Sequence, residues 1–506
     1  MKKLLILACL AYWPALGRAE APATPSFWQV ARAQPNVPGA PRHGDVTVRS
    51  LRRHPRSEYD PYDTFQMAQD FHITRLEWFS GADRACVQKA RELELVIGGG
   101  LGDALRDEQG SMELGRVTGK DGRPKAHPWF SPGTWVGCAN APEYRQTWLY
   151  RAKQYVDAGV DLIQQDDPQM AVRCTSLCYC RYCQAAFKAY QAEHGTKADY
   201  EQFQKDSVLA FHREMHRQLD AYAGRHVPFS HNNLIGFRGE LDWTAPAFDF
   251  VNAEIEGKMA QPAKLHQMVV NAGATPLVFQ YRETSVEKNR RALATFYALG
   301  AWMLLPWDVY MPNHAPRYFG KPEDYADLSG FIRAAAPYLD GYEEAAAAGP
   351  GLQETRYGRT RPVALAGGSG ETYAFVRARP GEPGSPVVVH LVEWGKQSKP
   401  FTLRLAAASF GSAELEAKLL VPAPYNPELH RQAQQTGNFS TLLVEAPLAM
   451  AASDGSLSVP IPGVRPWAIL MVQPRPRNAL SKVTAHADLT GSGAKSAKPV
   501  SSRQNL

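Results

Sequence analysis

The chain has 506 residues, of which 44% are hydrophobic and 21% are charged, a composition typical of a globular protein with more than one domain. Its formal net charge is +6. Three positive charges fall within residues 1–19 and a net five within the tail from residue 474, which leaves −2 on the body. A nearly neutral body lacks the basic surface that nucleic-acid binding requires, so we expect no nucleic-acid partner.

Residues 1–19 have the pattern of a secretory signal peptide. Lys2 and Lys3 precede an apolar run over residues 4–10, and Gly17-Arg18-Ala19 offers small residues for cleavage. The run is too short to cross a bilayer, and no later stretch is apolar and long enough to do so. The sequence therefore predicts a periplasmic or secreted protein without a membrane span. An irregular Pro-rich segment, residues 20–45, follows the signal peptide, and residues 474–506 have the composition of a disordered tail.

Eight short apolar segments alternate with helical patterns over residues 46–345. The predicted strands are 46–50, 72–78, 93–102, 160–163, 227–233, 248–257, 275–284 and 301–310. Pro142 begins one of the intervening helices, which we expect to end near residue 157. This alternation predicts an α/β fold, a (β/α)8 TIM barrel, with catalytic groups at the C-terminal ends of its strands. A doubly wound open sheet is the alternative, but no glycine-rich phosphate motif follows the first strand.

From residue 351 to 473 the pattern changes to alternating apolar and polar residues between Gly and Pro turns. Such segments, without helices between them, predict a C-terminal antiparallel β-sandwich. We expect this domain to pack against the barrel, and carbohydrate binding is the alternative role.

Cysteines cluster after the fourth predicted strand. Cys178, Cys180 and Cys183 form a C-x-C-x2-C pattern, and Cys174 lies four residues earlier. This spacing favours tetrahedral zinc–thiolate coordination, because a disulfide across C-x-C is strained. A pair of disulfides is the alternative in an oxidising compartment.

The segment from Cys138 to Tyr190 resembles the zinc-cluster region of glycoside hydrolase family 42 β-galactosidases. The resemblance lies in CANAPEYRQ, then a strand ending in QQDDP, then CYCRYCQAAFKAY. It implies a four-thiolate structural zinc site made of Cys138, Cys178, Cys180 and Cys183. Pro168 stands where family 42 has its acid/base Glu, so the resemblance implies a related barrel family rather than family 42 itself. Assembly as trimers is frequent in that family, which implies a homo-oligomer.

Carboxylates at the strand ends are the candidates for catalysis, because glycoside hydrolysis requires two carboxyl groups beside the scissile bond. Asp166 and Asp167 end the fourth strand, Glu254 lies in the sixth and Glu283 in the seventh. Since side chains alternate along a strand, we expect only one of the two aspartates to face the barrel mouth from the strand itself.

Two assignments of these carboxylates are open. In the first, an aspartate is the acid/base and Glu283 the nucleophile, as in barrels resembling family 42. In the second, an aspartate is the nucleophile and Glu254 or Glu256 the acid, as in α-galactosidase-like and α-fucosidase-like barrels. A structural ion pair for Glu283 and loop capping by the aspartates are the alternatives to catalysis.

Polar and aromatic residues at strand ends are candidates for binding a sugar, which requires aromatic platforms and hydrogen-bonding groups. They are Glu77, Trp78, His231, Asn232, Asn233, Arg282, Trp307 and Asp308. No catalytic metal triad is visible, so we expect no catalytic cofactor. The sequence predicts an exported glycoside hydrolase acting on an oligo- or polysaccharide. The alternatives are a non-catalytic carbohydrate-binding barrel and a polysaccharide lyase with a Tyr, His or Lys base near Arg282.

Overall fold

The computed structural model describes fourteen parts of the chain. They are residues 24–49, 64–80, 83–102, 114–128, 133–168, 172, 177–234, 241–255, 260–281, 285–306, 321–353, 356–357, 361–411 and 414–475. The predicted signal peptide and all but the first two residues of the predicted tail lie outside these ranges.

Eight parallel strands form a closed barrel, which confirms the predicted fold class. In chain order the strands are β1 (Thr47–Arg49), β2 (Arg75–Ser80), β3 (Val96–Leu101), β4 (Leu162–Gln165), β5 (Phe229–Leu234), β6 (Phe250–Glu254), β7 (Leu277–Gln280) and β8 (Trp302–Pro306). Each strand pairs with the next along the chain, and β8 closes the barrel by pairing with β1. Every predicted strand segment contains or overlaps one of these strands.

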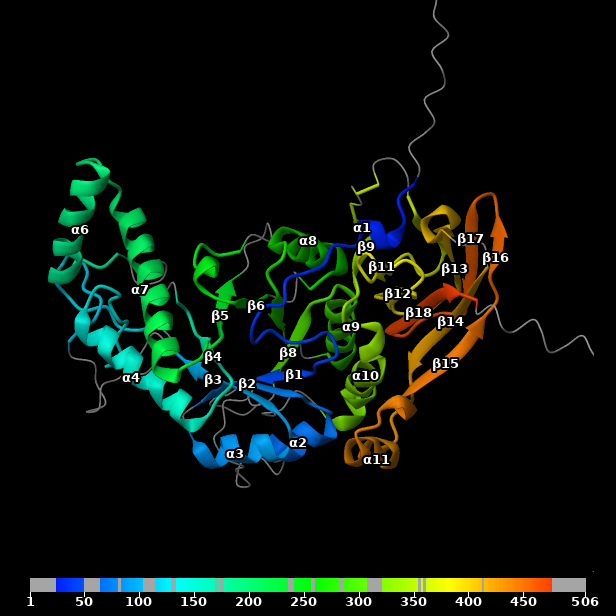
Figure 1. The fold of residues 1–506 in the computed structure, drawn as a ribbon, viewed down its shortest axis with the longest axis horizontal. Coiled ribbons are helices and arrows are strands. Elements are labelled where there is room, and N and C mark those ends of the chain that lie inside the picture. The colour runs from blue at the N-terminus through cyan, green and yellow to red at the C-terminus, as the bar shows by residue number, and fades with distance from the viewer. Residues whose placement is uncertain are drawn as a thin grey trace, which may run out of the picture.

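Helices surround the barrel. They are α2 (Thr64–Asp70), α3 (Arg84–Glu92), α4 (Pro142–Ala158), α6 (Arg181–His194), α7 (Tyr200–Ala223), α8 (Pro262–Ala272), α9 (Val286–Ala298) and α10 (Pro322–Ala335), with a 3-10 turn, η1, at Ala245–Ala247. Helix α4 begins with Pro142, as predicted, and ends at Gly159, whose φ of 92° favours glycine. Helices α6 and α7 project from the barrel on the side away from the C-terminal domain (Figure 1).

The interior of the barrel is unusually polar. Register places Gln164, Ser230 and Asn252 on the inner face of β4, β5 and β6. All three are fully or almost fully buried, and both Ser230 and Asn252 donate hydrogen bonds to the side-chain oxygen of Gln164. Because buried polar groups are costly unless they are paired, this network fixes the side chains beneath the mouth.

The C-terminal domain consists of two antiparallel sheets, which confirms the predicted β-sandwich. Its strands are β9 (Glu343–Ala348), β10 (Val363–Gly367), β11 (Thr372–Ala378), β12 (Val387–Glu393), β13 (Phe401–Ala406), β14 (Leu415–Pro422), β15 (Leu443–Leu448), β16 (Ala451–Ser453), β17 (Ser456–Ile461) and β18 (Trp467–Pro474). Six strands form one sheet and four the other. A short helix, α11 (Pro427–Thr436), lies between β14 and β15.

The two domains share one hydrophobic core. Barrel residues from α9 and α10, such as Phe296 and Phe331, join a buried cluster with Phe375, Trp467 and Ile469 of the six-stranded sheet. The rings of Phe331 and Trp467 meet edge to face, with centroids 4.9 Å apart. The sandwich is therefore packed against the barrel, as expected.

A short helix near the start of the chain, α1 (Phe27–Val30), completes the sandwich rather than the barrel. Phe27 and Trp28 are buried in the second hydrophobic cluster, between the two sheets, and both rings meet Phe410 edge to face. The Nε1 of Trp28 also donates a 3.0 Å hydrogen bond to Oγ of Ser385. The segment predicted to be irregular thus contributes to the core of the last domain.

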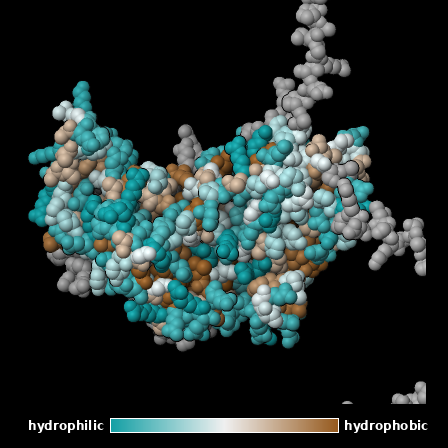
Figure 2. All heavy atoms as spheres, viewed as in Figure 1, coloured by the Kyte–Doolittle hydropathy of each residue, from teal (hydrophilic) through white to brown (hydrophobic). Residues whose placement is uncertain are grey.

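Hydrophilic side chains cover most of the face seen in Figure 2, with smaller hydrophobic areas over the barrel. Across the described residues, no helix combines the length and the apolar character needed to cross a membrane.

Candidate active site and cysteine cluster

The mouth of the barrel brings two carboxylates and an amide together at the ends of β4 and β5. The Nδ2 of Asn232 lies 3.1 Å from Oδ1 of Asp166 and 3.4 Å from Oδ1 of Asp167. Asn232 is 3% exposed, and its Oδ1 accepts no hydrogen bond from any described residue. The amide therefore orients both carboxylates while keeping a buried acceptor of its own.

Both aspartates reach Asn232 because the chain turns sharply at Asp167. Strand β4 ends at Gln165, and the backbone N–H of Asp166 still donates to the carbonyl of Leu101 over 2.7 Å. Asp167 has a φ of 43°, in the left-handed region that few residues other than glycine adopt. This differs from the expected strand alternation, which would have turned one aspartate away. Strained backbone of this kind is concentrated at functional sites.

Glu254 stands at the end of β6 on the same inner face. In the register of the sheet, Asn232 lies beside Asn252, and Glu254 is two residues further towards the mouth. Glu254 is half-buried and lies beside Gln280 of β7. Neighbouring strands are about 4.8 Å apart, so roughly 10 Å separates the backbones of β4 and β6. Side chains that lean into the mouth from these two strands can flank one bond of a substrate.

The opposite side of the barrel, at β1 and β2, contains two arginines, of which Arg75 is buried and Arg49 is half-buried. Glu77 is fully buried and pairs with Arg75, whose Nη2 lies 2.9 Å from Oε1 of Glu77. The guanidinium carbon of Arg49 lies 3.6 Å from the ring centroid of Trp78. Arg49 also donates to Oε1 of Gln280 over 2.8 Å. Glu77 therefore lies in an internal ion pair, and Trp78 serves as a stacking surface for Arg49.

Trp78 itself occupies an irregular position. Its φ is 58°, and the pairing of β2 with β3 shifts register between Leu76 and Phe79. A Cβ on Gly100 would lie 2.5 Å from Cδ1 of Trp78. The glycine at that position of β3 therefore makes room for the indole ring.

His231 faces away from the mouth. It lies beside Gln165 in the register, on the outer face of β5, and its ring stacks on Phe248 with centroids 4.4 Å apart. Burial lowers the pKa of His231 to about 3, and burial lowers that of the neighbouring His212 to about 3 as well. These neutral rings belong to the packing between the barrel and its helices. Asn233 lies in β5, and its side chain is outside the described part.

Several residues proposed from the sequence cannot be placed. Arg282, Glu283, Trp307 and Asp308 lie outside the described residues, as do Glu256 and Cys174.

The four cysteines of the proposed metal site do come together. The sulfurs of Cys138, Cys178, Cys180 and Cys183 all lie within 4.8 Å of one another. The Cys138 sulfur is 3.6 Å from that of Cys180 and 3.4 Å from that of Cys183, and none of the described cysteines forms a disulfide. A disulfide would require about 2.05 Å, so the disulfide alternative does not describe this cluster. Three of the four residues are buried, and Cys180 is partly exposed.

The surroundings of the cluster are suited to thiolate sulfur. The backbone N–H of Thr118 approaches the Cys178 sulfur at 3.5 Å, and Nδ2 of Asn140 approaches the Cys183 sulfur at 3.4 Å. Hydrogen bonds that the Cys138 thiol donates to the three neighbouring sulfurs, together with burial, raise the pKa of that thiol well above its ordinary value. Four such sulfurs cannot all be ionised side by side without a cation, and a metal ion reverses that preference.

Two residues of the mouth escaped the sequence interpretation. Arg49 ends β1 and Gln280 ends β7, and their hydrogen bond links the two strands that flank β8. Both occupy the strand-end position that was used to select the other candidates. The sequence pattern did not identify them because it placed the ends of these two short strands too late in the chain.

Comparison with known proteins supports the fold. No family model matches the chain, and no curated protein sequence matches it. Among solved structures, α-L-fucosidase isoenzyme 2 from Paenibacillus thiaminolyticus is similar with a TM-score of 0.50 at 10% identity, covering 89% of this chain and 100% of that chain. The maltogenic α-amylase AmyB from Thermotoga neapolitana has a TM-score of 0.48 at 10% identity, covering 85% of this chain and 99% of that one. The β-galactosidase from Marinomonas ef1 has a TM-score of 0.46 at 13% identity, covering 60% of this chain and 62% of that one. At 10% identity the likeness to the fucosidase shows the overall fold alone.

Proposed function

We propose that this chain is a glycoside hydrolase that cleaves an oligo- or polysaccharide, with Asp166 and Glu254 as its two catalytic carboxyls. The observation that carries the proposal is the meeting of Asp166, Asp167 and Asn232 at the C-terminal ends of β4 and β5, with Glu254 inward-facing on β6. Barrel enzymes place their catalytic groups at this end. The fucosidase of similar fold hydrolyses glycosidic bonds by its name, which supports the same reaction class here.

The proposed roles follow from the environment of each carboxyl. Asp166 accepts the amide hydrogen bond of Asn232, as suits an ionised group that only accepts. Its oxygen attacks the anomeric carbon while Glu254 gives its proton to the departing glycosidic oxygen. Water then attacks the glycosyl ester, gives its proton to Glu254 and frees Asp166 with the anomeric configuration retained.

A glycan panel tests the reaction. Purified protein is incubated with neutral and acidic polysaccharides, and released reducing ends are measured. Asp166→Asn and Glu254→Gln should each lower kcat at least about 1,000-fold, whereas Glu445→Gln, an exposed glutamate of β15, should leave it unchanged. Proton NMR of the first product should show retention.

Three other results would contradict the proposed reaction or its assignment of residues. Loss of activity in Glu283→Gln but not in Glu254→Gln would favour the other assignment, with Glu283 as nucleophile and an aspartate as acid/base. A product absorbing in the ultraviolet would indicate a lyase, and tight binding without any turnover would indicate a non-catalytic glycan-binding barrel.

We also propose that Cys138, Cys178, Cys180 and Cys183 hold a structural zinc ion. Four sulfurs placed tetrahedrally at 2.3 Å from zinc would be about 3.8 Å apart, and the sulfur separations of 3.4 to 4.8 Å bracket that value. With all four positions filled by the protein, such a site is closed and has no place for substrate. Mass spectrometry of the native protein should show one zinc per chain, and its absence after expression with zinc would overturn this.

Export remains a proposal from the sequence. The signal-peptide pattern of residues 1–19 supports a periplasmic or secreted location. N-terminal sequencing of the protein from a cell envelope fraction should show cleavage near residue 19, and a protein that keeps Met1 in the cytoplasm would contradict it.

A further inference from the structure

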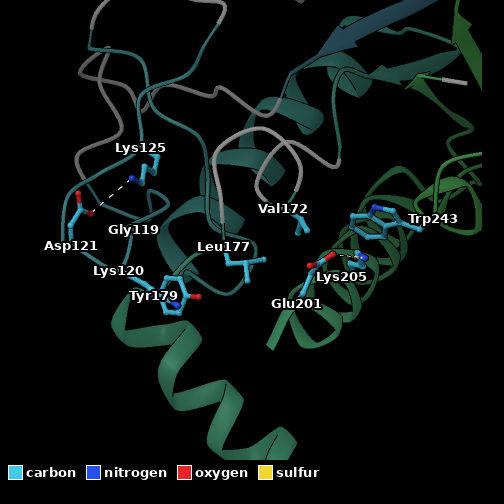
Figure 3. Close-up of a pocket in the computed structure, with 10 residues that line it drawn as sticks. All are labelled: Gly119, Lys120, Asp121, Lys125, Val172, Leu177, Tyr179, Glu201, Lys205 and Trp243. Atoms are coloured by element: carbon cyan, nitrogen blue, oxygen red, sulfur yellow. Dashed lines mark ion pairs between the residues drawn. The ribbon is translucent and has the colours of Figure 1, made fainter. Parts of the chain in front are cut away.

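A cavity of about 730 Å³ opens beside the barrel mouth, outside the catalytic constellation (Figure 3). Its lining residues are Gly119, Lys120, Asp121, Lys125, Val172, Leu177, Tyr179, Glu201, Lys205 and Trp243. Apart from Glu201 and Lys205 of α7, they come from the segments that follow β3, β4 and β5. The segments after β4 and β5 start at Asp166 and just beyond Asn232, so the cavity and the mouth occupy the same end of the barrel.

The charge of this cavity is positive. Three lysines line it against two carboxylates, Asp121 and Glu201. Lys205 pairs with Glu201 at 2.7 Å, and Lys125 approaches Asp121 at 4.0 Å. No carboxylate in the described part of the chain pairs with Lys120, whose ammonium lies 5.2 Å from the centroid of the Tyr179 ring. Lys120 is exposed and thus offers a cation to a ligand in the cavity.

Two aromatic rings border the same space. The ring of Trp243 is half-buried, and no described aromatic ring stacks on it. Tyr179 is stacked on one side by Tyr200, with centroids 4.8 Å apart and planes at 7°. Figure 3 shows Trp243 and Tyr179 at opposite ends of the cavity, with Lys205 near the former and Lys120 near the latter. Flat rings beside cations are suited to a sugar ring that carries an acidic group.

The cysteine cluster holds one wall of the cavity in place. Tyr179 lies between Cys178 and Cys180, and its backbone N–H donates to the carbonyl of Thr118 over 2.6 Å. The next residues after Thr118 are Gly119 and Lys120, and the Thr118 N–H approaches the Cys178 sulfur. A wall fixed before the ligand arrives reduces the entropy lost on binding.

We propose that this cavity is a distal glycan subsite that recognises a carboxylate or sulfate group on a sugar several units from the cleaved bond. Lys120 neutralises the acidic group, and Trp243 stacks on the ring of a neighbouring sugar. The proposal rests on the proposed function, because it assumes that a glycan chain extends from this cavity into the barrel mouth. It narrows the substrate to an acidic polysaccharide.

Binding to the full-length Asp166→Asn variant tests the subsite without turnover. Isothermal titration is carried out with polygalacturonate, dextran sulfate and uncharged dextran. At least one acidic polymer should bind about tenfold more tightly than dextran, and whichever binds identifies carboxylate or sulfate as the recognised group. Adding Lys120→Met should remove most of that preference, while Lys399→Met, an exposed lysine before β13, should not. Trp243→Ala should weaken binding of the acidic polymer.

Failure of the subsite proposal can be distinguished from failure of the hydrolase proposal. Equal binding of dextran and the acidic polymers, or an unchanged preference in Lys120→Met, overturns the subsite even if the protein hydrolyses glycans. Selective binding of an acidic polymer that is lost in Lys120→Met supports the subsite even if no glycan is cleaved. In that case only the hydrolase proposal is contradicted. Because Lys120 is exposed, its variant should fold, and thermal melting confirms this for each protein used.

Discussion

Asn232 on β5 donates its side-chain amide to Asp166 beyond the end of β4 over 3.1 Å, which joins two adjacent strands at the mouth of the barrel. The same amide reaches Asp167 at 3.4 Å. Because one amide nitrogen contacts both carboxylates, we expect its loss to lower kcat more than the stability of the fold.

We predict that Asn232→Leu lowers kcat roughly 10- to 100-fold, which corresponds to a lost hydrogen bond to a charged group of about 1.5–3 kcal/mol. The hydrolysis assay with the best substrate of the glycan panel measures it. Asn289→Leu is the matched control, because Asn289 is a buried asparagine on α9 that donates to Tyr325 outside the barrel sheet. Similar losses of kcat in the two variants would contradict a role for Asn232 at the site.

Glu77 should behave as a structural residue. Since Glu77 is fully buried against Arg75, Glu77→Gln leaves that guanidinium without its carboxylate, and we expect a loss of about 3–5 kcal/mol in the free energy of unfolding. Urea titration measures the loss. The kcat of the folded fraction should stay near that of the wild type, and a large rise in KM at unchanged stability would instead make Glu77 a substrate ligand.

Removal of the metal should loosen the wall of the acidic subsite. Cys138→Ser and Cys183→Ser should each abolish stoichiometric zinc and lower the melting temperature. They should also weaken binding of the acidic polymer, because Tyr179 lies between two cluster cysteines. Cys86→Ser, at a buried cysteine of α3 outside the cluster, should keep the zinc. Full zinc content in the Cys138→Ser variant would exclude the four-sulfur site.

The contact between His72 and His430 should make the junction of the two domains sensitive to acid. Nε2 of His72 lies 2.8 Å from Nδ1 of His430. Burial lowers the pKa of His72 to about 4, and burial also lowers that of His430. Between pH 6.5 and 4 the unfolded chain therefore binds protons that the folded chain does not.

Stability should accordingly be constant above pH 6.5 as far as this pair is concerned, and should fall as the pH drops towards 4. Thermal melting at pH 7.5, 6.0 and 4.5 follows this. In His72→Asn the fall should be smaller, because an amide does not titrate. His194→Asn, at an exposed position on α6, should show the wild-type fall. An unaltered pH profile in His72→Asn would remove the histidine pair as the cause.

The sequence was sufficient to predict the barrel because its strands are short apolar runs separated by amphipathic helices, and each run contains or overlaps a strand of the structure. It also predicted three members of the cysteine cluster from their local spacing, whereas Cys138 was assigned from the family resemblance. It could not predict which way strand-end side chains point. Glu77 and His231 satisfied the strand-end rule, yet one lies in an internal ion pair and the other packs outside the sheet.

The reasons are local departures from regular geometry. A register shift in β2 displaces the alternation at Trp78, and the left-handed turn at Asp167 brings a second aspartate to Asn232. The sequence also did not predict the cavity, because its lysines and its tryptophan come from separate segments spread over residues 120–243. Such sites depend on tertiary structure, which pattern and composition do not encode.

The early helix α1 has a consequence for the synthesis of this protein. Trp28 emerges from the ribosome long before Ser385, the partner that lies 357 residues later. At roughly 5–20 residues per second, about 20–70 s pass before the sandwich exists to cover the two aromatic rings. A fragment that stops after the barrel would leave exposed both these two rings and the residues of α9 and α10 that pack against the six-stranded sheet.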